Sequence, residues 1–229
     1  MITVGWIGSY MIRKDIDRPN PEQIEALRGV SPNDLGHHVH FGFTDASIEY
    51  LGGARPVSMI GPVLTVRIPP EDSVMVHKAT ELAREEDVIV VDQGGHTENA
   101  PWGEMTTRGA VASGAAGAVI DGSITDSREI EELGFPVYAR GRSARTTRLH
   151  GRGGEINVPV QVGGTTVSPG DVAVGNEDGV LFLPRDRLDE AINLHQTLEG
   201  REAELIERLE AGESLAEITD ANRLIAEME

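Results

Sequence analysis

The sequence contains no cysteine, few aromatic residues and hardly any lysine. Without cysteine the chain forms no disulfide, uses no thiolate nucleophile and binds no zinc ion or iron–sulfur cluster through sulfur. Only Lys14 and Lys78 among the 20 cationic side chains are lysines, and the others are arginines. Because the chain has no cysteine, any metal ion that the protein uses must be held by oxygen or imidazole ligands.

Long apolar segments are also absent. No stretch reaches the roughly 18 to 20 uninterrupted apolar residues that span a bilayer, and the first residues lack the basic and apolar regions of a secretory signal. We therefore expect a cytoplasmic protein. A chain of 229 residues with 39% hydrophobic residues is long enough for one well-filled core, and we expect a single domain over residues 1–229.

The net charge of −18 is the strongest feature of the composition. Nucleic acids and anionic membranes would be repelled by such a surface, so small molecules and proteins are the expected partners. An acidic surface with few lysines suits a cell with high internal salt, because salt screens the repulsion between like charges. We hypothesise a halophilic source, and the alternative is an ordinary acidic protein.

Short apolar runs alternate with helical patterns through the middle of the chain. The expected strands cover residues 57–68, 87–92, 117–120 and 136–139. The expected helices between them cover residues 75–84, 103–114 and 127–133. Strand, helix, strand is the parallel crossover unit, and residues 57–68 are either one strand or a bent pair.

The two ends of the chain have different patterns. Short helices are expected at residues 21–27 and from residue 31. Residues 155–183 contain short β-rich runs separated by glycines, which predicts a small antiparallel sheet. A long charged helix is expected at residues 185–209, with one shorter helix after Gly212. The whole pattern indicates an α/β domain with parallel strand–helix–strand units and a small antiparallel sheet.

The most informative residues stand where two expected strands end. Gly103 begins a helix, and Asp126 follows the strand that ends near residue 120. A helix amino terminus attracts anions through its free N–H groups, and an aspartate can bring a hard cation to the same edge of a sheet. A bound carboxylate or phosphate beside a metal ion is one interpretation. The other is that Gly103 is only a tolerated helix glycine and Asp126 only caps the helix beginning at Ser127.

Several separate motifs carry a resemblance to a known family. They are Asp92-Gln93-Gly94-Gly95, Trp102-Gly103-Glu104, Asp121-Gly122 with Thr125-Asp126, and Gly134-Phe135-Pro136. In this order and spacing, the sequence resembles the metal-dependent 4-hydroxy-4-methyl-2-oxoglutarate aldolases and the regulators of ribonuclease activity A, the RraA-like family. The resemblance covers roughly residues 55–185 and leaves residues 185–229 as carboxyl-terminal helices.

The resemblance implies a β/β/α swivelling-domain fold, like that of phosphohistidine domains, assembled as homotrimers or hexamers. It implies a Mg²⁺ or Mn²⁺ ion held directly by Asp126, and through water by Glu104 and by Glu202 of the partner subunit. Glu104 and Asp126, with the residue at position 125, would be catalytic. The positions implied to bind the substrate are Gly103, Met105, Thr106 and Arg142.

Thr125 departs from the family pattern, which has arginine at this position. An arginine would offer a cation and a planar pair of donors to the substrate, and a threonine hydroxyl does not replace that charge. Arg140, Arg142 and Arg145 are candidates to reach the site in its place. Alternatively the substrate differs, or the protein has no aldolase activity.

Two functions follow from these observations. The first is a divalent-metal-dependent carbon–carbon lyase, an aldolase or an oxaloacetate decarboxylase, because a 2-oxo acid develops enolate charge on bond cleavage that a metal ion stabilises. The second is a non-catalytic protein that binds and regulates an RNA-degrading enzyme. The histidines His37, His38 and His40 are a further candidate metal site, or else a partly exposed helix end.

Overall fold

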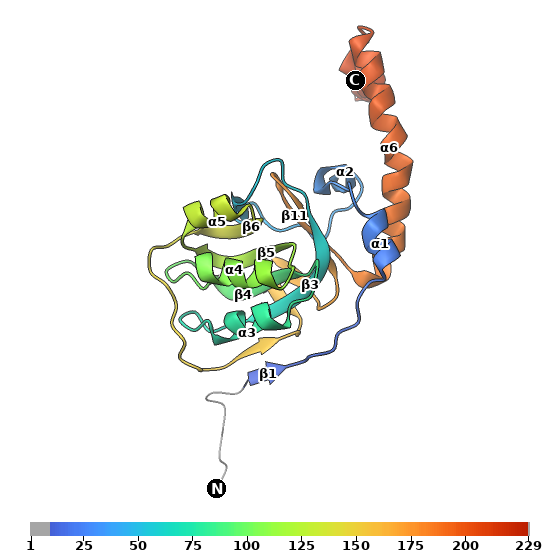
Figure 1. The fold of residues 1–229 in the computed structure, drawn as a ribbon. Coiled ribbons are helices and arrows are strands. Elements are labelled where there is room, and N and C mark those ends of the chain that lie inside the picture. Colours follow the sequence, from blue (N-terminus) through green and yellow to red (C-terminus); the bar gives the residue numbers. More distant parts are fainter. Residues whose placement is uncertain (1–9, 229) are drawn as a thin grey trace.

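A mixed sheet of nine strands forms the centre of the computed structural model, which describes residues 10–228 with the exception of the side chains at positions 199, 200 and 202 (Figure 1). Its parallel centre consists of β3 (Met59–Arg67), β4 (Val88–His96), β5 (Gly117–Ile124) and β6 (Val137–Arg142). The outer strands are β2 (Glu49–Gly52), β7 (Gly154–Ile156) and β1 (Tyr10–Ile12). The expected α/β fold is confirmed.

Three helices cover one face of this sheet (Figure 1). They are α3 (Val74–Leu82), α4 (Glu104–Ala112) and α5 (Ser127–Leu133), each connecting two strands of the parallel centre. Because side chains alternate along a strand, Ile89 and Val91 face the helices, whereas Val88 and Val90 face the opposite core. All four are fully buried, which explains why this strand is continuously apolar.

The strands β4 and β5 are longer than the sequence predicts. We expected β4 to end at Asp92, but its pairing with β5 continues to His96 after a register shift between Asp92 and His96. Gly94 and Gly95 lie within this irregularity at positive φ angles of 67° and 73°. Glycine adopts this conformation without steric cost, so the pair marks a bulge in the strand rather than its end.

The antiparallel part of the sheet is attached through β3. The first half of β3 pairs with β10 (Val172–Asn176), and its second half pairs with β4. Residues 57–68 therefore contain one strand that changes partner along its length. Strand β11 (Gly179–Leu183) pairs with β10, and β8 (Val160–Val162) pairs with β9 (Thr165–Val167) in a separate two-stranded sheet. The expected antiparallel pairing is present, but the segment divides: β10 and β11 join the main sheet through β3, whereas β8 and β9 form a sheet of their own.

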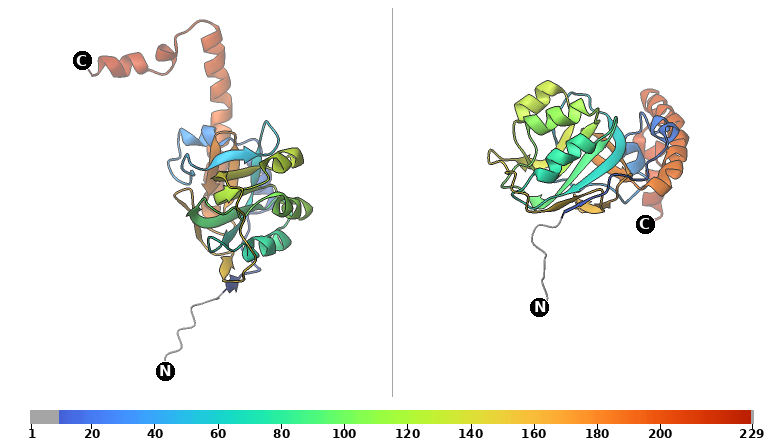
Figure 2. Two further views of the ribbon diagram at one scale, coloured as in Figure 1. Left: turned by 90° about the vertical axis from the view of Figure 1, so that its left-hand side faces the viewer. Right: turned by 60° about the horizontal axis from the view of Figure 1, so that its bottom comes forward.

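Helices at both ends of the chain form a second layer beside β10 and β11. The helices α1 (Pro21–Ala26) and α2 (Pro32–Gly36) begin at side-chain caps from Asn20 and Ser31. After a short 3₁₀ turn, α6 (Leu188–Glu210) packs against α1 and α2 and then extends away from the sheet (Figures 1 and 2).

The segment after Gly212 contains two short helices where we expected one. These are α7 (Leu215–Ile218) and α8 (Ala221–Ala226). Asp220 separates them because its backbone takes the left-handed conformation, with φ at 59°, which a right-handed helix cannot continue. Within the described residues, no helix is both long enough and apolar enough to cross a membrane.

Candidate functional site

The candidate site lies where β4 and β5 end and the helices α4 and α5 begin. A bridge between Trp102 and Ile124 holds the two connections together, and Thr125 N donates to Trp102 O at 2.9 Å. This contact brings the two halves of the motif, Gly103-Glu104 and Thr125-Asp126, side by side. The spacing in the sequence therefore predicted a real proximity.

Asp126 directs its carboxylate toward the amino terminus of α4. It precedes α5 but makes no side-chain cap there, and its Oδ2 instead accepts a hydrogen bond from Glu104 N at 3.0 Å. Its backbone lies in the left-handed region, with φ at 53° and ψ at 39°. Its Oδ1 accepts from the Thr125 hydroxyl at 3.2 Å. The interpretation that Asp126 only caps α5 is thus wrong.

Gly103 is required by the close approach of Asp126. Its backbone is extended, with φ at −162°, so the need for glycine does not come from its conformation. A Cβ atom at this position would lie 2.6 Å from Asp126 Oδ2 and 2.7 Å from Thr125 Cγ2. Both distances are shorter than van der Waals contact, so a larger residue would push the aspartate away from α4.

The first turn of α4 is held in place by hydroxyl groups. The Thr106 hydroxyl accepts from Gly103 N and donates to Gly103 O, both at 2.9 Å. The Thr107 hydroxyl also donates to Gly103 O at 2.9 Å and accepts from Trp102 Nε1 at 2.9 Å. Trp102 is 1% exposed, so it is a core residue that anchors this turn.

The amides of Met105 and Thr106 have no hydrogen-bond acceptor among the residues that the structure describes. The first N–H groups of a helix lack partners within the helix, and the helix dipole makes them an attractive site for an anion. The Met105 side chain beside them is 72% exposed, so the surrounding surface is open to solvent. An anion can therefore approach these amides next to the Asp126 carboxylate.

Glu104 contributes to the site through its backbone, while its side chain points along the helix. The Glu104 carboxylate accepts from Arg108 Nε at 2.8 Å and forms an ion pair with the same guanidinium. The expected role of Glu104 in holding a metal-bound water stays a prediction. It requires only a side-chain rotation, because this ion pair between residues four apart is exposed and weak.

The three arginines considered as substitutes for Thr125 all have partners elsewhere. Arg140 contacts Asp121 and lies 3.5 Å from Asp45. Arg142 donates from Nη2 to Leu51 O at 3.1 Å, and Arg145 lies 3.4 Å from Glu98. Of the three, Arg142 is paired through its backbone with Ile124, the residue before Thr125. Its expected role in substrate binding stays a prediction.

Gln93 is a residue of this region that the sequence analysis missed. It is 2% exposed, and its Nε2 donates to Pro70 O and to Asn99 O, both at 2.8 Å. These bonds tie the connection that leads to Trp102 onto the end of the sheet. The signal in the sequence was a polar residue directly after a buried strand, but its partners are backbone carbonyls that no side-chain pattern reveals.

Asp92 and Asp121, which belong to the family motifs, lie on the other face of the sheet. They are register partners in β4 and β5, and each follows by two residues a valine that packs on the core opposite the helices. Asp92 accepts from Arg67 Nε at 3.4 Å and from Gln161 N at 3.2 Å. Burial raises the pKa of Asp121, while the Arg140 guanidinium acts in the opposite direction. Asp92 and Asp121 therefore take part in a structural network.

Oxygen atoms are the donors that the candidate site offers to a metal ion. Within the described part of the chain, no three histidine, aspartate or glutamate side chains come together as a ready-made site. His37, His38 and His40 are exposed, and the structure does not group them. An exposed carboxylate such as Asp126, completed by water and substrate oxygens, fits a hard cation such as Mg²⁺ or Mn²⁺. The backbone of Glu202 belongs to α6, but its side chain is outside the described residues.

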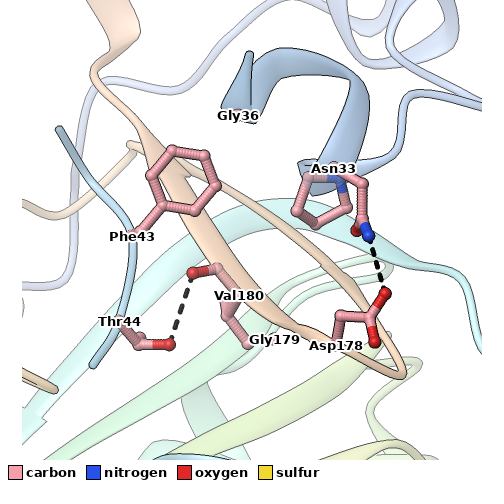
Figure 3. Close-up of a pocket in the computed structure, with 8 residues that line it drawn as sticks. Asn33, Gly36, Phe43, Thr44, Asp178, Gly179 and Val180 are labelled. Atoms are coloured by element: carbon pink, nitrogen blue, oxygen red, sulfur yellow. Dashed lines mark hydrogen bonds between the residues drawn. The ribbon is translucent and has the colours of Figure 1, made fainter. Parts of the chain in front are cut away.

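A cavity of about 190 Å³ lies away from this site, between α2 and the turn that joins β10 to β11 (Figure 3). Its polar groups pair with one another, since Asn33 Nδ2 donates to Asp178 Oδ2 at 2.6 Å and the Thr44 hydroxyl donates to Val180 O at 3.4 Å. Phe43 forms an apolar wall. None of the residues expected to act in catalysis lines this cavity.

Comparisons with known proteins find relatives that carry aldolase names. A 4-hydroxy-4-methyl-2-oxoglutarate aldolase of Thermus thermophilus is 35% identical over 124 residues, which cover 54% of this chain and 74% of the relative. A Halalkalibacterium halodurans protein with a provisional assignment as the same aldolase is 39% identical over 127 residues, or 56% of this chain. That match spans 60% of the length of the Halalkalibacterium relative.

A solved structure from Streptomyces coelicolor, described as an unusual member of the RNase ES inhibitor RraA family, has a TM-score of 0.73 and 26% identity. The likeness covers 83% of this chain and 100% of the Streptomyces chain. The family model described as RraA-like, Aldolase/RraA, matches residues 36–182. This range contains the candidate site and the motifs around it. The chain therefore belongs to the RraA-like family.

Proposed function

We propose that the protein is a divalent-metal-dependent carbon–carbon lyase that acts on a small 2-oxo acid, as a pyruvate-type aldolase or an oxaloacetate decarboxylase. One observation carries the proposal. The Asp126 carboxylate lies against the first turn of α4, where the Met105 and Thr106 amides have no acceptor among the described residues. A negative and a positive element therefore stand side by side at an open edge of the sheet.

The residues of the chain divide the work of binding a 2-oxo acid. The amides of Met105 and Thr106 would bind the substrate carboxylate, because a helix amino terminus stabilises an anion. Asp126 would hold Mg²⁺ or Mn²⁺, and its two bonds from Glu104 N and Thr125 Oγ1 fix the direction of its carboxylate. When bound, the ion would stabilise the negative charge that develops on the keto oxygen as the carbon–carbon bond breaks.

Proton transfer is the role proposed for Glu104. Its carboxylate is partly exposed and stands one turn from Arg108, at the open side of the first turn of α4. From there it would orient a water molecule toward the carbon that loses its substituent. Gly103 permits this arrangement because it leaves room for Asp126.

Thr125 determines which substrate the site favours. Its hydroxyl donates to Asp126, so it supports the aspartate instead of offering a cation to the substrate. A substrate that needs a second fixed positive charge would react slowly here. Oxaloacetate decarboxylation needs only the 2-oxo acid group to be bound. We therefore expect it to be faster than aldol cleavage of a larger dicarboxylate.

The test is turnover of oxaloacetate and of a pyruvate aldol after removal of metal with a chelator and after addition of Mg²⁺ or Mn²⁺. The proposal predicts turnover that disappears with the chelator and returns with either ion. The variant Asp126→Ala should lose this turnover. Its matched control is Asp178→Ala, since Asp178 is an exposed aspartate away from the site, and this control should behave as the unmodified protein. Equal rates with and without metal would contradict the proposal.

A second candidate function is binding to an RNA-degrading enzyme as a non-catalytic regulator. The threonine at position 125, where the resemblance implies arginine, and the likeness to the Streptomyces inhibitor-family structure favour it. In this case neither ion would produce turnover, and the purified protein would lower the activity of a ribonuclease E-type enzyme in a direct assay. An effect on the ribonuclease that survives Asp126→Ala would assign it to a surface other than the candidate site.

A further inference from the structure

Arg108 pairs with one of the two carboxylates of the candidate site. Its Nε donates to Glu104 Oε1 at 2.8 Å, and its Nη2 lies 2.8 Å from the same oxygen. Asp126, the other carboxylate, accepts from an amide and a hydroxyl. Within the part of the chain that the structure describes, no other lysine or arginine forms an ion pair with either carboxylate.

The direction of the Arg108 side chain brings its charge to the amino end of α4. Helix side chains lean toward the amino terminus, and residues four apart are neighbours on the surface. Arg108 therefore reaches back to Glu104, the first residue of α4. Arg128 does the opposite on α5, which lies beside α4 in Figure 1, since its Nε donates to Glu132 Oε1 at 2.9 Å. Of these two arginines, Arg108 is the one directed toward the open amides.

The pair of Arg108 and Glu104 can exchange partners at little cost. Both contacts of the guanidinium go to Glu104 Oε1, and the two side chains are 54% and 33% exposed. An exposed ion pair between residues four apart is weak, because water competes for both groups. A carboxylate that belongs to a ligand can therefore replace Glu104 on the guanidinium.

The charges of the proposed site leave a use for this guanidinium. The carboxylates of Asp126 and Glu104 together balance the charge of one divalent ion. The first carboxylate of a 2-oxo acid then meets the Met105 and Thr106 amides, whose partial charges offset part of its charge. Any second anionic group of the ligand needs a cation, and Arg108 is the cation in contact with the site.

The position of Arg108 along α4 fits a second anionic group. The amides proposed to bind the first carboxylate belong to the first turn of α4. One helical turn rises about 5.4 Å, and the guanidinium lies beside this turn because it contacts Glu104. A carboxylate a few bonds farther along a 2-oxo acid therefore comes within reach of Arg108.

We propose that Arg108 exchanges partners when a substrate binds, so that its guanidinium releases Glu104 and binds a second anionic group of the 2-oxo acid. The exchange frees the Glu104 carboxylate for the proton transfer proposed above. This inference rests on the proposed function, because it requires a 2-oxo acid on the open amides. A long exposed side chain is not held in a fixed geometry, so Arg108 lowers KM for such a substrate more than it raises kcat.

Two ligands of equal length test the inference by isothermal titration calorimetry of the full chain in Mg²⁺. The ligand 2-oxoglutarate ends in a carboxylate and 2-oxopentanoate ends in a methyl group, and neither carries the leaving group that aldol cleavage or decarboxylation requires. The unmodified protein should bind 2-oxoglutarate about fivefold more tightly, the size of one exposed ion pair. In Arg108→Gln this preference should disappear, while the affinity for 2-oxopentanoate should stay within about twofold.

Three further variants show what the preference depends on. Arg128→Gln is the matched control, because it removes an exposed helix arginine from a pair of the same spacing, and it should keep the preference. Arg108→Lys keeps the charge without the planar fork and should keep part of the preference. Glu104→Gln removes the competing carboxylate, so the preference for 2-oxoglutarate should increase, which a purely structural role of Arg108 would not cause.

The outcomes separate this inference from the proposed function, with circular dichroism of each variant to report folding. If 2-oxopentanoate binds but the preference for 2-oxoglutarate is absent or survives Arg108→Gln, the inference is overturned and the proposed function stands. Loss of the preference in Arg128→Gln as well also overturns the inference, because the field of the whole protein then carries it. If neither ligand binds the unmodified protein, the inference and the proposed function are both overturned.

Discussion

Two aspartate sites lie at the same edge of the sheet, on opposite faces, and they differ in how their charge is balanced. Asp121 is buried and faces the Arg140 guanidinium, and its register partner Asp92 accepts from Arg67 and from a backbone N–H. Asp126 is exposed and receives one backbone N–H and one hydroxyl. At the first site, protein groups balance the charges of Asp121 and Asp92 and hold the strands together. At the second site, the charge of Asp126 is available to a ligand.

The largest difference should follow removal of Asp126. In Asp126→Ala the only protein carboxylate expected to contact the ion is lost, so metal-dependent turnover should fall at least about a thousandfold. Because Asp126 caps α4 and its backbone is left-handed, the free energy of unfolding should fall by about 1 to 2 kcal/mol, which leaves the protein folded. Steady-state kinetics and urea denaturation measure the two quantities. A variant that unfolds much more easily would show that Asp126 is structural.

The opposite result is expected for Asp121→Ala. This change leaves the Arg140 guanidinium, which is 20% exposed, without its main partner, and should lower the free energy of unfolding by about 3 kcal/mol. The turnover of the folded protein should remain within about threefold, because Asp121 points away from α4. Urea denaturation followed by kinetics below the transition tests both statements. A loss of turnover without a loss of stability would place Asp121 in catalysis.

Salt should act on the exposed charges and leave the buried pair largely unaffected. With a net charge of −18, repulsion across the surface destabilises the protein in dilute buffer, and molar potassium chloride screens it. We expect the melting temperature to rise by about 5 °C, or roughly 2 kcal/mol for a chain of this size. Thermal melts of the unmodified protein and of Asp121→Ala should shift equally. Equal melting temperatures in both buffers would contradict the halophilic hypothesis.

The variant Thr125→Arg places a cation beside Asp126, as Arg140 stands beside Asp121. A guanidinium beside Asp126 would offer the substrate the positive charge that the resemblance implies at this position, and pyruvate-aldol cleavage should rise about tenfold. Thr125→Val is the control, because it removes the hydroxyl bond to Asp126 without adding charge. If Thr125→Arg gives no gain, the arginine has paired with Asp126 as Arg140 pairs with Asp121, and the surrounding pocket has been rebuilt.

The sequence predicted the strand–helix–strand order because the parallel centre is buried on both faces. The short β-branched run from Val88 to Val91, closed by Gly94 and Gly95, is typical of a strand in such a sheet, and Gly103 and Asp126 stood at the ends of neighbouring elements. The extension of β4 to His96 was not predictable, because it depends on pairing with β5 across a register shift. The break at Asp220 likewise depends on one backbone angle.

Side-chain direction was the part of the site that the sequence could not provide. Asp126 caps α4 instead of α5 because its backbone is left-handed, and no residue pattern encodes that choice. Asp92 and Asp121 belong to the same motifs, yet the alternation of strand side chains turns them to the other face. Gln93 acts through the carbonyls of Pro70 and Asn99, which only the folded chain brings to it.

The smallest effect separates two buried aspartates by the sign of their pH dependence. Burial raises the pKa of Asp121 above its ordinary value of 3.8, so the stability linked to its protonation is present at low pH and is lost as the pH rises through the raised pKa. Burial also acts to raise the pKa of Asp72, but hydrogen bonds from the Arg152, Val74 and His150 amides hold it below 3.8. Asp72 therefore stabilises the fold above that pH, and this contribution is lost as the pH falls through the lowered pKa. In urea denaturation at several pH values, Asp121→Asn should gain stability relative to the unmodified protein as the pH rises from below 3.8, whereas Asp72→Asn should lose it. If both variants lose stability as the pH rises, Arg140 outweighs burial at Asp121. The Asp121 site and the Asp126 site then differ in exposure alone.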